Sequence, residues 1–187
     1  MSSKQKKTNL VWLDLEMTGL DPKKCVILEI GAIVTSSQLE VISEGPEIAI
    51  HHSDKVLNSM EAWSRRTHGK SGLTKACRVS TVSLKKAEEA VLDFVETHCK
   101  PKTAPLCGNT IWQDRRFLVK YMPRLESYLH YRVIDVSSLK ELVGRWYPED
   151  HKMSRLKKQT HRVMEDIRES LDELRYYRNK VFKEHSQ

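Results

Sequence analysis

The sequence predicts an α/β fold in which one mixed sheet of five strands, the first three antiparallel, is flanked by helices. Three strand-like segments come first and are joined by short polar turns, which is typical of an antiparallel meander. Two further short strands then alternate with amphipathic helices. The chain of 187 residues is long enough to bury one core. We therefore expect a single domain over residues 1–187, with residues 1–8 as a flexible N-terminal tail.

The composition narrows the classes of protein to consider. Lysine and arginine number 32 against 25 acidic residues, and the formal net charge of +7 favours polyanionic partners such as nucleic acid. Simple solubility explains the same charge. No apolar run approaches the ~20 residues of a membrane span, so we expect no membrane contact. The four cysteines form no Cys-x-x-Cys pair, which argues against a zinc knuckle or a disulfide framework and favours a reducing cytoplasm.

Residues 9–21 carry the pattern that points most directly to chemistry. The segment starts as an apolar strand and ends in a Thr-Gly turn, and alternate side chains of a strand point to opposite faces. One face then holds Val11, Leu13 and Leu15, and the other holds Trp12, Asp14 and Glu16. Two neighbouring acids repel each other unless a cation lies between them, and oxygen ligands suit Mg²⁺ or Mn²⁺. A solvated edge strand is the alternative for such a pair, although the flanking residues here are apolar.

The second and third strands are expected over residues 25–36 and 39–50, which are rich in Val and Ile. Residues 44–46 (Glu-Gly-Pro) interrupt the third strand and predict a bulge or an edge there. Glu29 lies inside the second strand. It is a candidate neighbour of the acidic pair, and we do not count it as a ligand.

Apolar residues at helical spacing predict helices over residues 54–68 and 83–99. The second of these is a plain amphipathic helix to which we assign no chemistry. In the first, the ordinary role of Trp63 is core packing, and the alternative is a platform on which a nucleobase stacks. His68 would stand at the end of the same helix and face whatever Trp63 faces.

Residues 106–110 are expected to form a short strand that runs into a turn, and a helix is expected to follow over residues 112–121. Asp114 would lie in the first turn of this helix, where an acid is favourable for the helix dipole without any function. Asn109 and Thr110 would follow the C-terminal end of the strand. Open α/β sheets commonly bind ligands at that end.

The next segment predicts a strand over residues 133–136 and a helix that runs to about residue 147. Ser137 or Ser138 can cap this helix, and Ser138 with Glu141 forms a capping box. That structural role would suffice for both serines.

The last helix is expected over residues 161–182, with His161 and Asp166 near its start. Five residues of helix rise about 7.5 Å and turn these two side chains onto different faces. They could not form one two-ligand clamp. They could serve one site in two roles, with Asp166 on a metal and His161 mobile at the mouth.

Together, these motifs resemble the signature of the DEDD-type 3′→5′ exonucleases. The pieces are Asp14-x-Glu16, residues 109–114 (NTIWQD) and His161-x-x-x-x-Asp166, and the histidine is similar to that of the subgroup with a histidine base. Longer stretches look like bacterial oligoribonucleases over nearly the whole chain: LVWLDLEMTGLDP, GNTIWQDRRFLVKYMP, HYRVIDVSSLKEL and THRVMEDIRESLDELRYYR. Residues 148–158 are the least typical part.

The resemblance implies a ribonuclease H-like fold and a homodimer that requires no other protein. It implies a cytoplasmic exonuclease that hydrolyses single-stranded RNAs of two to five nucleotides to nucleoside 5′-monophosphates. Two divalent cations, Mg²⁺ or Mn²⁺, would be held by Asp14, Glu16, Asp114 and Asp166. His161 would take a proton from the attacking water, because an imidazole titrates near pH ~6.5.

The resemblance also implies which residues bind substrate. Leu20 would wedge between the two bases, and Trp63 and His68 would shape the 3′ side. Asn109 and Thr110 are also expected to bind substrate.

At the other end of the substrate, Arg132, Ser137 and Ser138 would hold the 5′ phosphate. Arg grips phosphate with a fork of donors, and hydroxyl groups at a helix start lie beside its positive end. Tyr131 would reach the active site across the dimer interface. A held 5′ phosphate would exclude longer chains.

Three other functions fit parts of the same pattern. A DNA proofreading subunit or a tRNA-trimming exonuclease would prefer longer 3′ ends to dinucleotides. A non-catalytic binding module would lack Mn²⁺-dependent activity and would still bind RNA after Asp14→Ala. A metal-dependent phosphatase would release inorganic phosphate.

Overall fold

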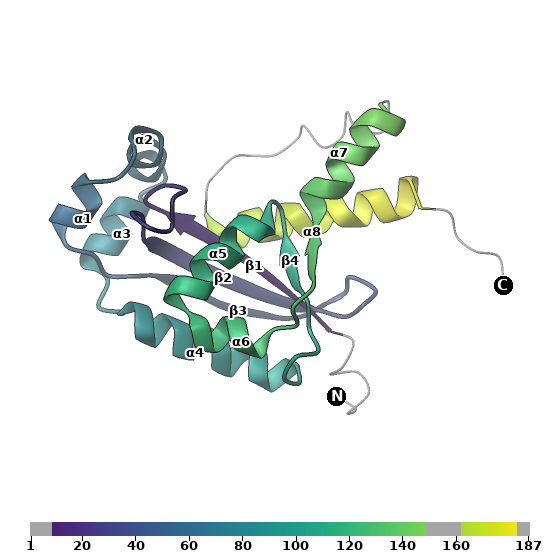
Figure 1. Cartoon of the computed structure of the whole chain (residues 1–187), viewed down its shortest axis with the longest axis horizontal. Helices are drawn as coiled ribbons and strands as arrows, with labels where there is room; N and C mark the ends of the chain where they lie inside the picture. Colours follow the sequence, from purple (N-terminus) through teal and green to yellow (C-terminus); the bar gives the residue numbers. More distant parts are fainter. Residues whose placement is uncertain (1–8, 149–161, 183–187) are drawn as a thin grey trace.

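The centre of the molecule is a five-stranded sheet in the order β3-β2-β1-β4-β5 (Figure 1). The structure is a computed structural model that describes residues 9–148 and 162–182. The first three strands are antiparallel, and β4 and β5 run parallel to β1. The strands are β1 (Leu10–Met17), β2 (Ile27–Thr35), β3 (Val41–Ala49), β4 (Leu106–Gly108) and β5 (Val133–Asp135). The predicted mixed sheet with an antiparallel first half is confirmed.

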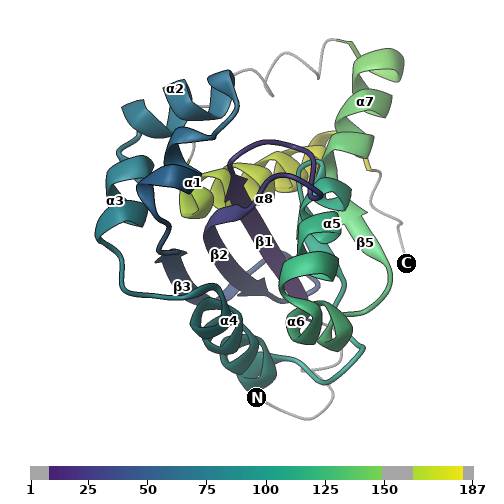
Figure 2. The same ribbon diagram turned by 60° about the vertical axis from the view of Figure 1, so that its left-hand side comes forward.

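Eight helices in the described residues surround this sheet. They are α1 (Asp54–Asn58), α2 (Ala62–Lys70), α3 (Leu73–Val79), α4 (Leu84–His98), α5 (Ile111–Tyr121), α6 (Pro123–Tyr128), α7 (Val136–Trp146) and α8 (Val163–Lys180). Side chains of α4, α5 and α6 pack in one core cluster, and those of α7 and α8 pack in another. Figure 2 shows α8 and α4 on opposite sides of the sheet. None of the described helices has the length and apolar character needed to cross a bilayer.

Strand β1 divides its side chains between the two cores as the sequence predicts. Val11, Leu13 and Leu15 belong to the cluster with α4 to α6, whereas Trp12 belongs to the cluster with α7 and α8. The buried Trp12 indole donates a hydrogen bond to Thr35 Oγ1 at 3.0 Å. The acids of β1 therefore share a face with Trp12, on the side that α8 covers.

The predicted helix over residues 54–68 is wrong in one respect, because the structure divides it into α1 and α2. The chain leaves the helix between Ser59 and Glu61, and the Glu61 N–H donates to the Thr18 carbonyl oxygen at 3.0 Å. A backbone bond to the turn after β1 thus replaces the helical bond. The short helices α3 and α6 were not predicted, and α2 continues past Gly69 to Lys70.

Two further local predictions have different outcomes. The irregularity expected near residues 44–46 is confirmed, because the β2–β3 register shifts between Gly31 and Ile33, opposite this segment. The cap expected from Ser137 or Ser138 is wrong. Helix α7 begins directly after β5, and the Asp135 carboxylate accepts the Ser137 N–H at 3.0 Å.

Candidate metal centre

Three carboxylates from distant parts of the chain meet on the α8 side of the sheet. Asp14 and Glu16 share one face of β1, and Asp166 lies in the first turn of α8, which packs against β1 and β2. Each of the three offers an oxygen atom, and these atoms all lie within 4.8 Å of one another. The structure therefore brings together three of the four acids that the sequence singled out as ligands.

Asp114, the fourth acid, is buried in the first turn of α5. Its Oδ1 accepts a hydrogen bond from the Leu15 N–H at 3.0 Å, which ties α5 to β1 between Asp14 and Glu16. Its charge also raises the pKa of Asp14, second only to burial. Asp114 thus borders the cluster and has one oxygen engaged by the backbone.

The electrostatics of the cluster are unfavourable without a cation. Burial and the neighbouring acids Asp114 and Glu16 raise the pKa of Asp14 well above its ordinary value. Burial, followed by the charge of Asp166, raises the pKa of Glu16 to about 8. Burial also raises the pKa of Asp114 to about 8. A divalent cation would reverse these shifts, and a set of carboxylate oxygens suits hard ions such as Mg²⁺ or Mn²⁺. The residues therefore fit a divalent metal.

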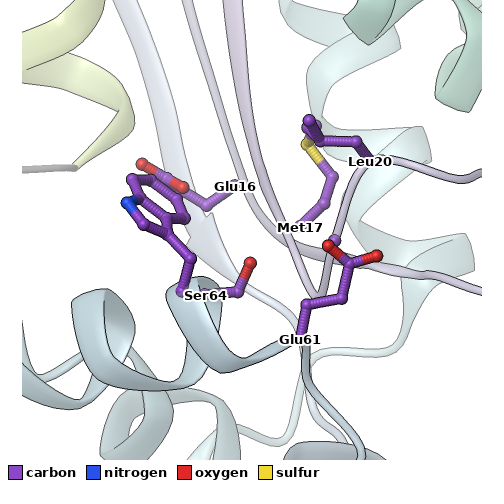
Figure 3. Close-up of a pocket in the computed structure, with 7 residues that line it drawn as sticks. Glu16, Met17, Leu20, Glu61 and Ser64 are labelled. Atoms are coloured by element: carbon purple, nitrogen blue, oxygen red, sulfur yellow. The ribbon is translucent and has the colours of Figure 1, made fainter.

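A cavity of about 290 Å³ opens beside Glu16 (Figure 3). The turn after β1 supplies one wall, including Leu20, which is 64% exposed. The start of α2 supplies the other wall, including Trp63, which is 53% exposed. The expected core packing of Trp63 is therefore wrong, because its half-exposed indole lines the same cavity as Glu16. The residues that line the cavity are Glu16, Met17, Gly19, Leu20, Glu61, Trp63 and Ser64.

His68 does not share the environment of Trp63, contrary to the sequence expectation. It is fully buried, and its Nε2 lies 2.9 Å from the Met17 carbonyl oxygen and 3.8 Å from Glu16 Oε2. The ring therefore contacts the end of β1 and one of the clustered acids.

A hydrogen-bonded network lies where β4 and β5 end. The Thr110 N–H donates to Asp135 Oδ1 at 3.0 Å and to Ser137 Oγ at 2.9 Å. The Ser137 hydroxyl donates to Asn109 Oδ1 at 3.0 Å. The Asn109 amide donates in turn to Ser170 Oγ of α8 at 2.7 Å. Three of the expected binding residues, Asn109, Thr110 and Ser137, are thus joined to one another, whereas Ser138 is exposed beside them.

Tyr131 and Arg132 lie before β5, away from this cavity. Tyr131 is 72% exposed, and the Arg132 guanidinium carbon lies 5.4 Å from the centre of its ring. Tyr131 lines a second cavity with Lys102, Arg115, Glu126, Leu129 and His130, and that cavity shares no residue with the first. Within one chain, the structure does not bring Tyr131 to the clustered acids.

His161 lies outside the described residues, as does the segment from residue 149 to it. The next residue, Arg162, lies within the described residues and was not predicted from the sequence as a site residue. Arg162 pairs with Glu29, which is fully buried and adds to the raised pKa of Asp14 and Glu16. A buried carboxylate is stabilised by a cationic partner, and this was the one signal in the sequence that could have pointed to Arg162. Glu61 and Ser64 of the cavity gave no signal of their own.

Comparison with known proteins gives the family from the sequence and the fold from the structure. The RNase T exonuclease family model matches residues 11–174. A protein of Marinobacter nauticus named oligoribonuclease is 53% identical over 93% of this chain and 96% of its own length. A protein of the same name from Pseudomonas aeruginosa PAO1 is 51% identical over 96% of this chain and 99% of its own length.

Among solved structures, E. coli exonuclease I in complex with a dT13 oligonucleotide superimposes with a TM-score of 0.72 at 14% identity. The match covers 92% of this chain and 41% of that one, so this chain spans about two fifths of exonuclease I. The likeness shows a shared ribonuclease H-like fold.

Proposed function

This chain belongs to the RNase T exonuclease family, and from that premise we propose that it removes nucleotides from the 3′ end of very short RNAs. Its substrates would be two to five nucleotides long and its products nucleoside 5′-monophosphates. The observation that carries the proposal is the cluster of Asp14, Glu16 and Asp166 beside a cavity with an exposed indole. Relatives named oligoribonuclease at about half identity over nearly full length support the choice of substrate.

Asp14, Glu16, Asp114 and Asp166 would hold two divalent ions, Mg²⁺ or Mn²⁺. Such ions make hydroxide available near neutral pH and stabilise the charge that develops on the leaving oxygen. The chain contributes the carboxylates on β1, α5 and α8 and their burial, which strengthens their interaction with a cation.

His161 would accept the proton of the attacking water, since imidazole changes its charge near neutral pH. It directly precedes Arg162, whose carbonyl oxygen accepts the Asp166 N–H at 3.0 Å. The proposed base is therefore adjacent in sequence to a residue that is bonded to the proposed ligand.

Substrate would lie with its 3′ base in the cavity between Leu20 and Trp63, and Leu20 would separate it from the next base. His68 would support this wall through its contact with Met17. Stacking on an aromatic side chain contributes about 1–3 kcal/mol per base, which is substantial for a substrate with only two bases.

The 5′ phosphate would lie at the network where β4 and β5 end. Ser137, Ser138 and Thr110 would contribute hydroxyl groups, and Asn109 would hold Ser137 in place. Tyr131 and Arg132 would come from the second subunit of a homodimer, because Tyr131 lines a separate cavity within its own chain. We also propose that the protein works in the reducing cytoplasm, since all four cysteines are buried and none forms a disulfide.

The test is product analysis on 5′-phosphorylated RNAs from two to eight nucleotides, with Mg²⁺, with Mn²⁺ and with chelator. We expect the dinucleotide to be cleaved fastest, nucleoside 5′-monophosphates to be the products, and chelator or Asp14→Ala to abolish turnover. Single-stranded DNA of equal length and release of inorganic phosphate are measured beside it. Faster degradation of the longest RNA, or preference for DNA, would contradict the proposal.

A further inference from the structure

Glu29 is a buried carboxylate that is not part of the three-oxygen cluster. It is fully buried on β2 and pairs directly with Glu16 in the β1–β2 register. Directly opposite residues of an antiparallel pair point to the same face of the sheet. Glu29 therefore lies beside a proposed metal ligand, and its charged form would be stabilised by a cation of its own.

Arg162 supplies that cation and engages both oxygens of Glu29. Its Nε lies 3.0 Å from Oε1 and 3.1 Å from Oε2, and its Nη2 lies 2.7 Å from Oε1. The same Nη2 donates to Glu47 Oε1 at 2.9 Å. The Val163 N–H also points to Glu29 Oε2, at 3.4 Å. The start of α8 is thus bound to β2 through one carboxylate.

The backbone of Arg162 is bonded to the turn that carries Asp166. Its carbonyl oxygen accepts the N–H groups of Glu165 and Asp166, both at 3.0 Å. Its side chain is bonded to β2 and its main chain to the first turn of α8. Displacement of Arg162 would therefore move Asp166 relative to Asp14 and Glu16.

The first turn of α8 also lies unusually close to β2. Gly31 pairs with Asp14 in the sheet, and a Cβ on Gly31 would lie only 2.8 Å from Val163 Cγ2. A glycine at this position lets the helix approach next to the strand pair that carries the acids. The close approach of Val163 to Gly31 and the ion pair between Arg162 and Glu29 both hold the first turn of α8 against β2.

From these contacts we propose that Arg162 is a positioning residue for the reaction. The guanidinium pairs with Glu29 and thereby holds Asp166 in position opposite the acids of β1. The role rests on the function proposed above. A guanidinium is needed because a lysine ammonium could not engage both oxygens in fixed geometry.

Four variants separate positioning from charge neutralisation. Arg162→Gln removes the guanidinium group that binds both oxygens of Glu29 and leaves Glu29 without a cationic partner. Arg162→Lys keeps the charge without the guanidinium group. Glu29→Gln with Arg162→Gln removes both charges, so it has no unpaired buried charge if the single variant proves too unstable. Arg168→Gln is the matched control, because Arg168 lies on the same helix and pairs with exposed Glu44.

Turnover of the dinucleotide and Mn²⁺ binding by electron paramagnetic resonance are measured for each variant, with rates corrected for the folded fraction. For Arg162→Gln we expect kcat to fall about 100-fold at little change in KM, and Mn²⁺ to bind about tenfold more weakly. The lysine variant recovers part of the loss. The double variant keeps a low kcat, and Arg168→Gln stays within about twofold of wild type.

Equal behaviour of Arg162→Gln and Arg168→Gln would overturn the proposal. Restoration of kcat and Mn²⁺ affinity in the double variant would overturn it too, because Arg162 would then only neutralise charge. A wild-type protein that binds Mn²⁺ and cleaves no RNA would refute the proposed function instead, while the Mn²⁺ titrations would still decide the role of Arg162.

Discussion

Two polar regions lie at the end of the sheet where β1 and β4 finish. They differ in whether their polar groups find partners within the protein. At the end of β4, the network of Asn109, Thr110, Asp135 and Ser137 pairs its donors with acceptors from the protein itself. On β1, Asp14 and Glu16 face Asp166, and burial and the charge of Asp166 both raise the pKa values of these two acids. The first region stabilises the fold. The second region lowers the stability of the metal-free fold, and its repulsion is relieved when a cation binds.

Asp166→Asn is expected to have the largest effect on activity, because it removes a proposed metal ligand from the acidic cluster. We expect dinucleotide turnover to fall about 1,000-fold or more, which corresponds to about 4 kcal/mol. The metal-free protein should become more stable by about 1–2 kcal/mol, seen as a rise of about 2–8 °C in Tm by calorimetry with chelator present. Asp172→Asn, on the exposed side of the same helix, is the control. A metal-free Tm below wild type would contradict the account.

The pH dependence of stability follows from the same acids. The pKa values of Glu16 and Asp114 are raised to about 8, so the folded metal-free protein keeps protons that the unfolded chain releases above its ordinary carboxyl pKa values. The free energy of unfolding therefore falls as pH rises from about 4.5 to about 8. We expect a higher metal-free Tm at pH 5 than at pH 8, and a larger rise on adding Mn²⁺ at pH 8. Scanning calorimetry at both pH values checks this, and the opposite order would refute it.

Trp63→Ala tests whether the cavity beside the acidic cluster binds a base of the substrate. Loss of a stacking platform should raise KM for the dinucleotide about tenfold, with a smaller change in kcat. Phe182→Ala is a suitable control, because both aromatic side chains are 53% exposed. Steady-state kinetics decides the matter, and equal KM values for the two variants would remove Trp63 from the binding site.

Ser137→Ala is expected to have the smallest effect on activity. It tests the hydrogen-bonded network at the end of β4. The loss of its bonds to Asn109 and Thr110 should cost about 1 kcal/mol of stability. KM should rise for a 5′-phosphorylated dinucleotide and stay unchanged for the same dinucleotide without that phosphate. Ser127→Ala, whose hydroxyl donates only within its own helix, is the control. An equal rise for both substrates would show that Ser137 acts through the fold and not through the phosphate.

The sequence predicted the parts of the fold that repeat over many residues. The alternation along β1 placed Asp14 and Glu16 on one face, and spacing placed Asp114 and Asp166 at helix starts, as observed. Short elements were missed, because α3 and α6 offer little more than one or two turns of periodicity.

Features fixed by distant contacts could not be predicted. The break before α2 depends on the bond from Glu61 to Thr18, and the start of α7 depends on Asp135, which outcompetes the serine caps. The sequence identifies Glu29 as an acid in an apolar strand. Its partner Arg162 lies more than a hundred positions away, and only the folded chain brings the two together.

The most direct test of the metal centre is calorimetric titration of Mn²⁺ at pH 7 in two buffers of different ionisation enthalpy. The account predicts binding by the wild-type protein with release of protons, because acids with raised pKa values must ionise to take the metal. It also predicts loss of that binding in Asp14→Asn. Binding that releases no protons, or that persists unchanged in Asp14→Asn, would contradict it.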